Sequence, residues 1–160
     1  MIGDIILYQS RGQEIRRLIF SLIEEAESPV VLLAHSLGGI ACVDLLIQGL
    51  DLSTPDENLL VREQLNKVKL LVTAGSQAPF LYEIGALYSR EYGEALPDYF
   101  PEWLNFYHKW DFLSYIGADV FPQPNKITDI EIDDEKRFLE SHNVYWENNK
   151  TWDEIALRLL

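Results

Sequence analysis

Apolar residues in several parts of this chain recur with the period of an α-helix. Between residues 13 and 26 they repeat at every third or fourth position, which predicts an amphipathic helix capped by Ser10 and ended before Pro29. The segment 3–8 is too short for its pattern to distinguish a strand from a helical turn. The last helix is expected to begin after a capping Thr151. The later helices are expected at residues 40–50, 59–64 and 152–160.

Residues 30–34 form an unbroken apolar run, which is typical of a strand covered on both faces in a parallel sheet, and residues 68–73 are interpreted as a second strand of this kind. Strands are expected at residues 30–34, 68–73, 103–107 and 127–132. Because these strands alternate with helices, the sequence predicts an α/β fold with a mostly parallel sheet, flanking helices and right-handed crossovers. In such sheets functional residues gather where the strands end.

The composition limits both the size of the fold and its partners. With 160 residues and 48% apolar content the chain can bury one core, so we expect a single domain over residues 1–160. A net charge of −13 disfavours nucleic acid and anionic membranes and favours neutral or cationic partners. The acidic residues between 129 and 135 are interpreted as a solvated turn and strand edge. No stretch approaches the ~20 apolar residues of a transmembrane helix and no signal peptide is visible, which predicts a soluble, cytoplasmic protein.

Metal and cofactor chemistry finds little support in the sequence. The single cysteine, Cys42, excludes an intramolecular disulfide, and its position in the predicted helix 40–50 favours a buried apolar role. The three histidines are too few and too scattered for a zinc site, and no glycine-rich phosphate loop follows a strand. We therefore expect no metal and no organic cofactor.

Residues 34–39, Ala-His-Ser-Leu-Gly-Gly, directly follow the first predicted strand. A strand that turns sharply into a helix leaves a serine hydroxyl exposed at the turn, and small neighbours allow the strained conformation. Ser36 is therefore the candidate nucleophile. The N–H of Leu37, at the helix start, is the candidate donor to an oxyanion formed on the substrate. The alternative is an ordinary strand-to-helix turn in which Ser36 only caps the helix.

A serine hydroxyl needs a histidine that accepts its proton and an acid that orients this histidine. His35 adjoins Ser36 and is expected to point to the wrong side of the turn, because neighbouring side chains diverge. His108 is expected in the third strand or on its flank. His142 follows the fourth predicted strand in a loop, from which an imidazole can reach the serine. We therefore prefer His142 as the general base.

Asp111 is the preferred acid because it follows the third predicted strand and precedes the loop of His142. Its rivals are Asp119, in a turn after Gly117-Ala118, and Asp133, in the acidic surface run. The chain order Ser36, Asp111, His142 is the serine, acid, histidine order of one hydrolase fold and differs from that of the two best-known serine protease folds.

Four segments of the chain resemble the α/β-hydrolase superfamily, and within it the lipase-like and esterase-like bacterial serine hydrolases. These segments are residues 34–39, 73–79, 107–114 and 141–146. The resemblance implies that Ser36 is the nucleophile, His142 the general base and acid, and Asp111 the orienting carboxylate. It further implies hydrolysis of a small-molecule or lipid ester through an acyl-enzyme, with the aromatic stretch 80–107 enclosing an apolar acyl chain.

The resemblance extends only to the C-terminal half of that fold. Ala34 replaces the first glycine of the usual motif, and 29 residues before Val30 leave room for at most one earlier strand. Either the chain is a piece of a longer protein, or it is a minimal sheet in which residues 9–12 supply the second oxyanion donor, or it is an incomplete relative with little activity. A partner chain or a missing N-terminal segment would complete the sheet. The alternatives to an ester hydrolase are a non-catalytic or partner-completed interaction module, and an acyltransferase or thioesterase.

Overall fold

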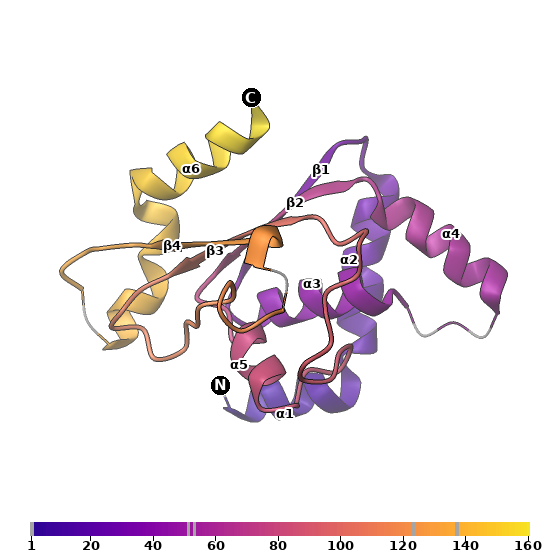
Figure 1. Cartoon of the computed structure of the whole chain (residues 1–160), viewed down its shortest axis with the longest axis horizontal. Helices are drawn as coiled ribbons and strands as arrows, with labels where there is room; N and C mark the ends of the chain where they lie inside the picture. Colours follow the sequence, from indigo (N-terminus) through magenta and orange to yellow (C-terminus); the bar gives the residue numbers. More distant parts are fainter. Residues whose placement is uncertain (1, 51, 53, 123, 137) are drawn as a thin grey trace.

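The computed structural model describes residues 2–50, 52, 54–122, 124–136 and 138–160. Four strands form one sheet in the order β1-β2-β3-β4, and every neighbouring pair is parallel (Figure 1). The strands are β1 (Val30–His35), β2 (Val68–Ala74), β3 (Glu102–Tyr107) and β4 (Ile127–Glu131). The predicted α/β fold with a parallel sheet and flanking helices is therefore confirmed.

The helices lie before, between and after the strands, as the alternation of patterns predicts. They are α1 (Ile2–Arg11), α2 (Gln13–Glu25), α3 (Leu37–Gln48), α4 (Pro55–Leu65), α5 (Ala78–Glu83) and α6 (Asn149–Leu159). Three short 3-10 segments accompany them: η1 (Pro124–Lys126), η2 (Phe138–Asn143) and η3 (Tyr145–Glu147). The segment 3–8, which the sequence left undecided, is helical.

The predicted cap of α2 is wrong. Ser10 lies inside α1, where its Oγ donates to the carbonyl of Leu7 at 2.9 Å. Gly12 occupies the cap position of α2 and offers no side-chain hydrogen bond. A pattern of apolar positions therefore locates the helix, whereas its first residue depends on where the preceding helix ends.

The start of α4 and the cap of α6 also differ from expectation. The expected helix 59–64 begins earlier, at Pro55, because Thr54 accepts a hydrogen bond from the N–H of Glu57. The cap of α6 is Asn148, whereas the predicted cap, Thr151, lies inside the helix.

Apolar side chains cover the two faces of the sheet in separate clusters. Along β2, Leu71 packs with α2, α3 and α4 on one face, and Leu70 and Val72 pack with α6 and η3 on the other, as the alternation of a strand requires. Cys42 is buried in the first cluster, and this burial raises the pKa of its thiol to about 12. Its predicted structural place is confirmed.

The prediction that both faces of the first strand are covered is only partly confirmed. Leu32 packs against the first apolar cluster and Val31 against the second, but Leu33 is 49% exposed. β1 pairs only with β2 among the described strands, so it forms one edge of the sheet. An unbroken apolar run predicts a strand but does not specify how many neighbours it has.

A buried polar network joins the N-terminal helices to α3. The hydroxyl of Tyr8 donates to Asp44 at 2.7 Å and accepts from Arg16 at 3.3 Å, and the N–H of Ser89 donates to Asp44 at 3.0 Å. Burial of Asp44 raises the pKa of its carboxyl. Because unpaired buried polar groups are costly, this network fixes α1 and α2 against the site-bearing part of the fold.

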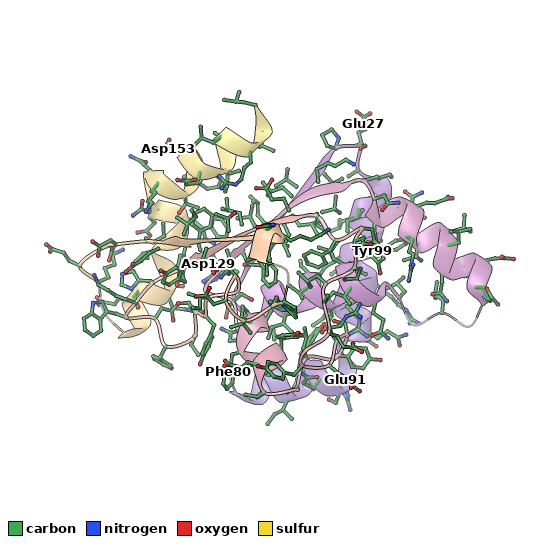
Figure 2. The ribbon with its side chains drawn as sticks, viewed as in Figure 1. Glu27, Phe80, Glu91, Tyr99, Asp129 and Asp153 are labelled. Carbon is green, nitrogen blue, oxygen red and sulfur yellow. The ribbon has the colours of Figure 1, made fainter. Side chains whose placement is uncertain are left out.

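The aromatic stretch between β2 and β3 is only partly buried, because Tyr82 and Phe100 lie in the core whereas Tyr88, Tyr92 and Tyr99 are exposed. Tyr82 stacks on Phe121 with ring centroids 4.1 Å apart, and Phe80 in α5 stacks on Tyr115 at 4.8 Å. Figure 2 shows Phe80 and Tyr99 at separate places along this stretch, and the hydroxyl of Tyr99 donates to the carbonyl of Ile47. These contacts hold the long connection against α3 and α5.

The acidic residues between 129 and 135 do not all form a solvated turn and strand edge. Asp129 in β4, labelled in Figure 2, accepts hydrogen bonds from Asn105 at 2.7 Å and from the N–H groups of Gly117 and Ala118. This carboxylate therefore holds the turn at residues 117–118, which follows the loop that carries Asp111.

In the part of the chain that the structure describes, no helix is long and apolar enough to cross a membrane.

Candidate active site

Ser36 lies in a strained turn between β1 and α3. Its φ is +54° and its ψ is −124°, and no other non-glycine residue among those described has a positive φ. Its N–H donates to the carbonyl of Ala74 at 2.9 Å, and its carbonyl accepts from Gly39 at 2.9 Å. The side chain makes no capping bond to α3, which argues against the alternative of a simple helix-capping serine. Strain of this kind is stored where a side chain has to be presented in one direction.

The backbone at the start of α3 provides a site for negative charge. Leu37 is the first residue of the helix, so its N–H has no intrahelical acceptor. The positive end of the helix dipole lies at the same place. An oxyanion that forms on a substrate bound to Ser36 would therefore accept a hydrogen bond from the N–H of Leu37.

Asp111 and His142 are joined by a direct hydrogen bond. The Nδ1 of His142 lies 2.8 Å from Oδ2 of Asp111, although 31 residues separate them along the chain. A carboxylate only accepts, so Nδ1 carries the proton and Nε2 keeps its lone pair. The imidazole therefore has the tautomer that can accept a proton from a hydroxyl group.

Two further donors hold the carboxylate of Asp111. The hydroxyl of Tyr145 donates to Oδ2 at 2.6 Å, and the N–H of Leu113 donates to Oδ1 at 3.0 Å. Burial alone would raise the pKa of Asp111, but the hydrogen bonds from His142, Tyr145 and Leu113 outweigh it and lower the pKa below its ordinary value. Asp111 is therefore ionised at neutral pH.

Gly75, directly after β2, gives the imidazole its place beside Ser36. Its φ is +60°, and a Cβ at this position would lie 2.9 Å from Cε1 of His142 and 3.0 Å from Cε2 of Tyr145. Only glycine leaves the space that both rings fill. The carbonyl of Ala74, the preceding residue, accepts from Ser36 N–H, so the glycine that contacts His142 directly follows the residue bonded to the serine turn.

The described residues contain no hydrogen bond between Ser36 Oγ and His142. Instead, Nε2 of Gln77 donates to Ser36 Oγ at 3.4 Å. The serine oxygen accepts in this contact, so its own proton remains free for the imidazole. Serine-to-histidine bonds are often long in a free enzyme and shorten during the reaction.

Gln77 was not singled out from the sequence, yet it connects three parts of the site. The two protons of its side-chain amide are directed to the carbonyls of Gly75 and Leu113, both at 3.0 Å, so the 3.4 Å contact with Ser36 is a weak, shared one. It therefore links the serine turn to the loop that carries Asp111. Its position directly after the second strand was the available signal, because the strands of a parallel sheet end at the same edge.

The other histidines occupy different environments. His108 is buried, and its Nδ1 accepts from the N–H of Trp110 at 3.1 Å. The expectation that His35 points away from the site is wrong, because its ring centroid lies 4.7 Å from that of His142. Of these two rings, only that of His35 therefore belongs to the site.

The rival acids lie on the surface. Asp119 is exposed, and Asp133 forms an exposed ion pair with Lys109 at 2.9 Å. Lys109 lowers the pKa of Asp133 through this contact. Among the three candidate carboxylates, only Asp111 contacts a histidine through a hydrogen bond in the described chain.

Residues 9–12 do not supply the second oxyanion donor. They form the end of α1 and its junction with α2, and the N–H of Gly12 donates to the carbonyl of Tyr8. The side chain of Gln9 is bonded to the carbonyl of Ala86 at 2.6 Å. This alternative from the sequence is therefore not supported by the backbone.

A comparison of the chain with protein-family models, curated proteins and solved structures finds no match. Within the described residues no group of three or more His, Cys, Asp or Glu side chains is arranged to hold a metal ion. The chemistry of the site therefore has to be argued from its own geometry. A strained serine, an imidazole bonded through Nδ1 to a carboxylate, and the ionised carboxylate itself form a set that can support nucleophilic catalysis.

Proposed function

We propose that this chain is a serine hydrolase that cleaves carboxylic esters through an acyl-enzyme on Ser36. The observation that carries the proposal is the hydrogen-bonded pair of Asp111 and His142 next to a serine with a strained backbone. Pairing of an acid and a histidine is common in proteins, but such a pair near a half-buried serine in a strand-to-helix turn is typical of nucleophilic catalysis.

In the proposed reaction Nε2 of His142 takes the proton of Ser36 as Oγ bonds to the ester carbonyl. The negative charge of Asp111 stabilises the imidazolium that forms, and the N–H of Leu37 donates to the oxyanion. The carbon–oxygen bond of the ester then breaks, and His142 returns the proton to the departing alkoxide. Water attacks the acyl-enzyme by the same steps and releases the acid.

The substrate class follows from charge and surroundings. The net charge of −13 favours neutral or cationic esters over anionic ones. The exposed aromatic side chains near the acid loop, Trp110 and Phe112, offer an apolar surface for an acyl chain. We therefore expect a neutral ester with an apolar acyl group to react faster than an anionic ester of equal length.

The test is covalent labelling by a fluorophosphonate, which phosphonylates activated serines. Wild type should gain one adduct by intact mass, and Ser36→Ala should gain none. Ser21→Ala is the matched control, because this serine lies in α2, where its Oγ donates to the carbonyl of Leu18. A wild-type protein that is folded but does not react would refute the proposal.

A second candidate is a module completed by another polypeptide, favoured by the open edge of β1 and the half-exposed Leu33. In this interpretation an extended segment of the partner adds a strand to β1. The purified chain should then be poorly soluble or aggregated alone at neutral pH. A soluble monomer with a cooperative unfolding transition would count against this candidate.

A further inference from the structure

His35 makes a contact that the proposed reaction does not use. It is the last residue of β1 and directly precedes Ser36. Its Nε2 lies 2.6 Å from the main-chain oxygen of His142, a residue 107 positions later in the chain. The two rings are 4.7 Å apart and inclined by 36°. The strand that presents the nucleophile is therefore bonded directly to the main chain of the general base.

The partner atom determines the protonation of His35. A carbonyl oxygen only accepts, so Nε2 of His35 carries a proton and donates it. Burial lowers the pKa of His35 below its ordinary value and outweighs the hydrogen bond to the carbonyl of His142, which raises it, so the ring is neutral at neutral pH. A neutral donor holds the carbonyl without placing a second positive charge beside an imidazolium at His142.

The segment that carries His142 needs such support. It belongs to η2, a 3-10 segment, whose hydrogen-bond geometry is poorer than that of an α-helix. Asp111 fixes the ring of His142 at Nδ1, and His35 fixes the same residue at its main-chain oxygen. With both ends held, Nε2 of His142 has one preferred direction.

We propose that His35 is a positioning residue, which holds the backbone of His142 so that its free Nε2 faces Ser36. The inference rests on the proposed function, because the direction of Nε2 matters only if Nε2 accepts the serine proton. It makes His35 and Asp111 two independent supports of one imidazole, one at the backbone and one at the ring. Removal of His35 should therefore slow the chemical step more than substrate binding.

The test compares His35→Leu with His35→Gln. The amide nitrogen of glutamine reaches about as far as Nε2 of histidine and can donate to the same carbonyl, whereas leucine cannot. With p-nitrophenyl butyrate as substrate, His35→Leu should lower kcat by about ten- to a hundredfold with little change in KM, a typical effect of a misplaced catalytic group. His35→Gln should recover most of this loss. Equal activity of His35→Leu and wild type, or no recovery in His35→Gln, would overturn the inference.

A measurement on the unmodified protein keeps the proposal open to refutation if the variants fold poorly. The ¹⁵N chemical shifts of the His35 ring should indicate a protonated Nε2 and an unprotonated Nδ1 at neutral pH. The opposite tautomer would overturn the role of His35 alone, whereas fluorophosphonate labelling of Ser36 would still support the hydrolase. A wild type that neither hydrolyses the ester nor is labelled would overturn the proposed function and this inference together.

Discussion

Oδ2 of Asp111 accepts two hydrogen bonds, from Nδ1 of His142 at 2.8 Å and from the hydroxyl of Tyr145 at 2.6 Å. The second donor has no proton to give to a substrate, because burial and the neighbouring Asp111 raise the pKa of Tyr145 far above its ordinary value. Its role is to hold the carboxylate in its ionised form. A hydrogen bond to a charged group stabilises a fold more than one between neutral groups.

Tyr145→Phe should therefore destabilise the protein by about 1–3 kcal/mol at pH 7. The pKa of Asp111 is lowered in the fold, so the stability due to its ionised form is present above the pKa of the unfolded chain and is lost as the pH falls through the folded value. The deficit of Tyr145→Phe should thus shrink below about pH 4. Urea unfolding of wild type and Tyr145→Phe at several pH values measures the loss of stability and its dependence on pH.

Tyr99→Phe is the control for this prediction, because the hydroxyl of Tyr99 donates to an uncharged group, the carbonyl of Ile47, at 2.6 Å. Its deficit should not vary with pH over the same range. A deficit of Tyr145→Phe that is equally constant would contradict the role assigned to the ionised carboxylate.

Gly75 and Gly85 allow backbone strain to be separated from contact. Their φ values are +60° and +67°, but a Cβ at Gly75 would meet His142 and Tyr145, whereas a Cβ at Gly85 would meet nothing within 4 Å. Gly85→Ala should cost about 1–2 kcal/mol from strain alone. Gly75→Ala should cost more and should also slow fluorophosphonate labelling, because the ring of His142 is displaced. Equal costs and equal labelling rates would show that the close packing at Gly75 has no role.

At the scale of elements, helix α6 contacts the segment that carries Tyr145 and His142. Thr151 is fully buried in this helix, and its Oγ1 donates to the carbonyl of Tyr145 at 2.6 Å. Val144 and Tyr145 pack with Ile155 of α6 and with β2 and β3. The helix therefore fixes the segment that places both Tyr145 and His142 at the ends of the strands.

Thr151→Val keeps the shape of the side chain and removes the donor, so the carbonyl of Tyr145 loses a buried partner. We expect a loss of about 1–3 kcal/mol in the free energy of unfolding and slower labelling of Ser36. Thr151→Ser keeps the hydroxyl and should label at nearly the wild-type rate, even though it loses a buried methyl group. If serine slows labelling as much as valine does, the hydrogen bond is not what α6 contributes.

The elements differ in how far the sequence determines them. The mainly apolar run at residues 68–73 predicts β2 to within one residue, because a strand buried on both faces is apolar at most positions; Lys69 is its one exposed residue. Ser10 and Thr151 are the wrong residues for the caps of α2 and α6. Any polar residue near a helix end satisfies the sequence pattern, and tertiary contacts determine which residue caps the helix. Thr151 is bonded to Tyr145 instead of its own helix, and Asn148 caps α6.

The same limit applies to the candidate site. The order of strands places Asp111 and His142 at one edge of the sheet, so their proximity could be predicted from the sequence. The contacts of His35, Gln77 and Tyr145 could not, because each joins residues more than 30 positions apart through irregular loops. No local pattern encodes the path of such loops.

At the scale of the whole molecule, charge and sheet topology have opposite effects on association. The outer edge of β1 has no neighbouring strand among the described residues, and the half-exposed Leu33 adds an apolar surface to it. Exposed edges of this kind pair readily with other chains. The net charge of −13 at pH 7 opposes contact between copies, and this repulsion weakens as the pH approaches the isoelectric point of about 4.5.

We therefore expect the protein to sediment as a monomer at pH 7 in low salt and to associate through β1 at about pH 5.5, where fewer negative charges remain. Leu33→Lys should suppress this association, because a lysine on an edge strand blocks pairing. Leu60→Lys is the matched control: it makes the same change of charge at a leucine that is 61% exposed, but in α4 and away from the sheet edge. Sedimentation velocity of wild type and both variants at both pH values is the test. If both variants suppress association alike, the association depends on net charge and the edge of β1 has no role in it.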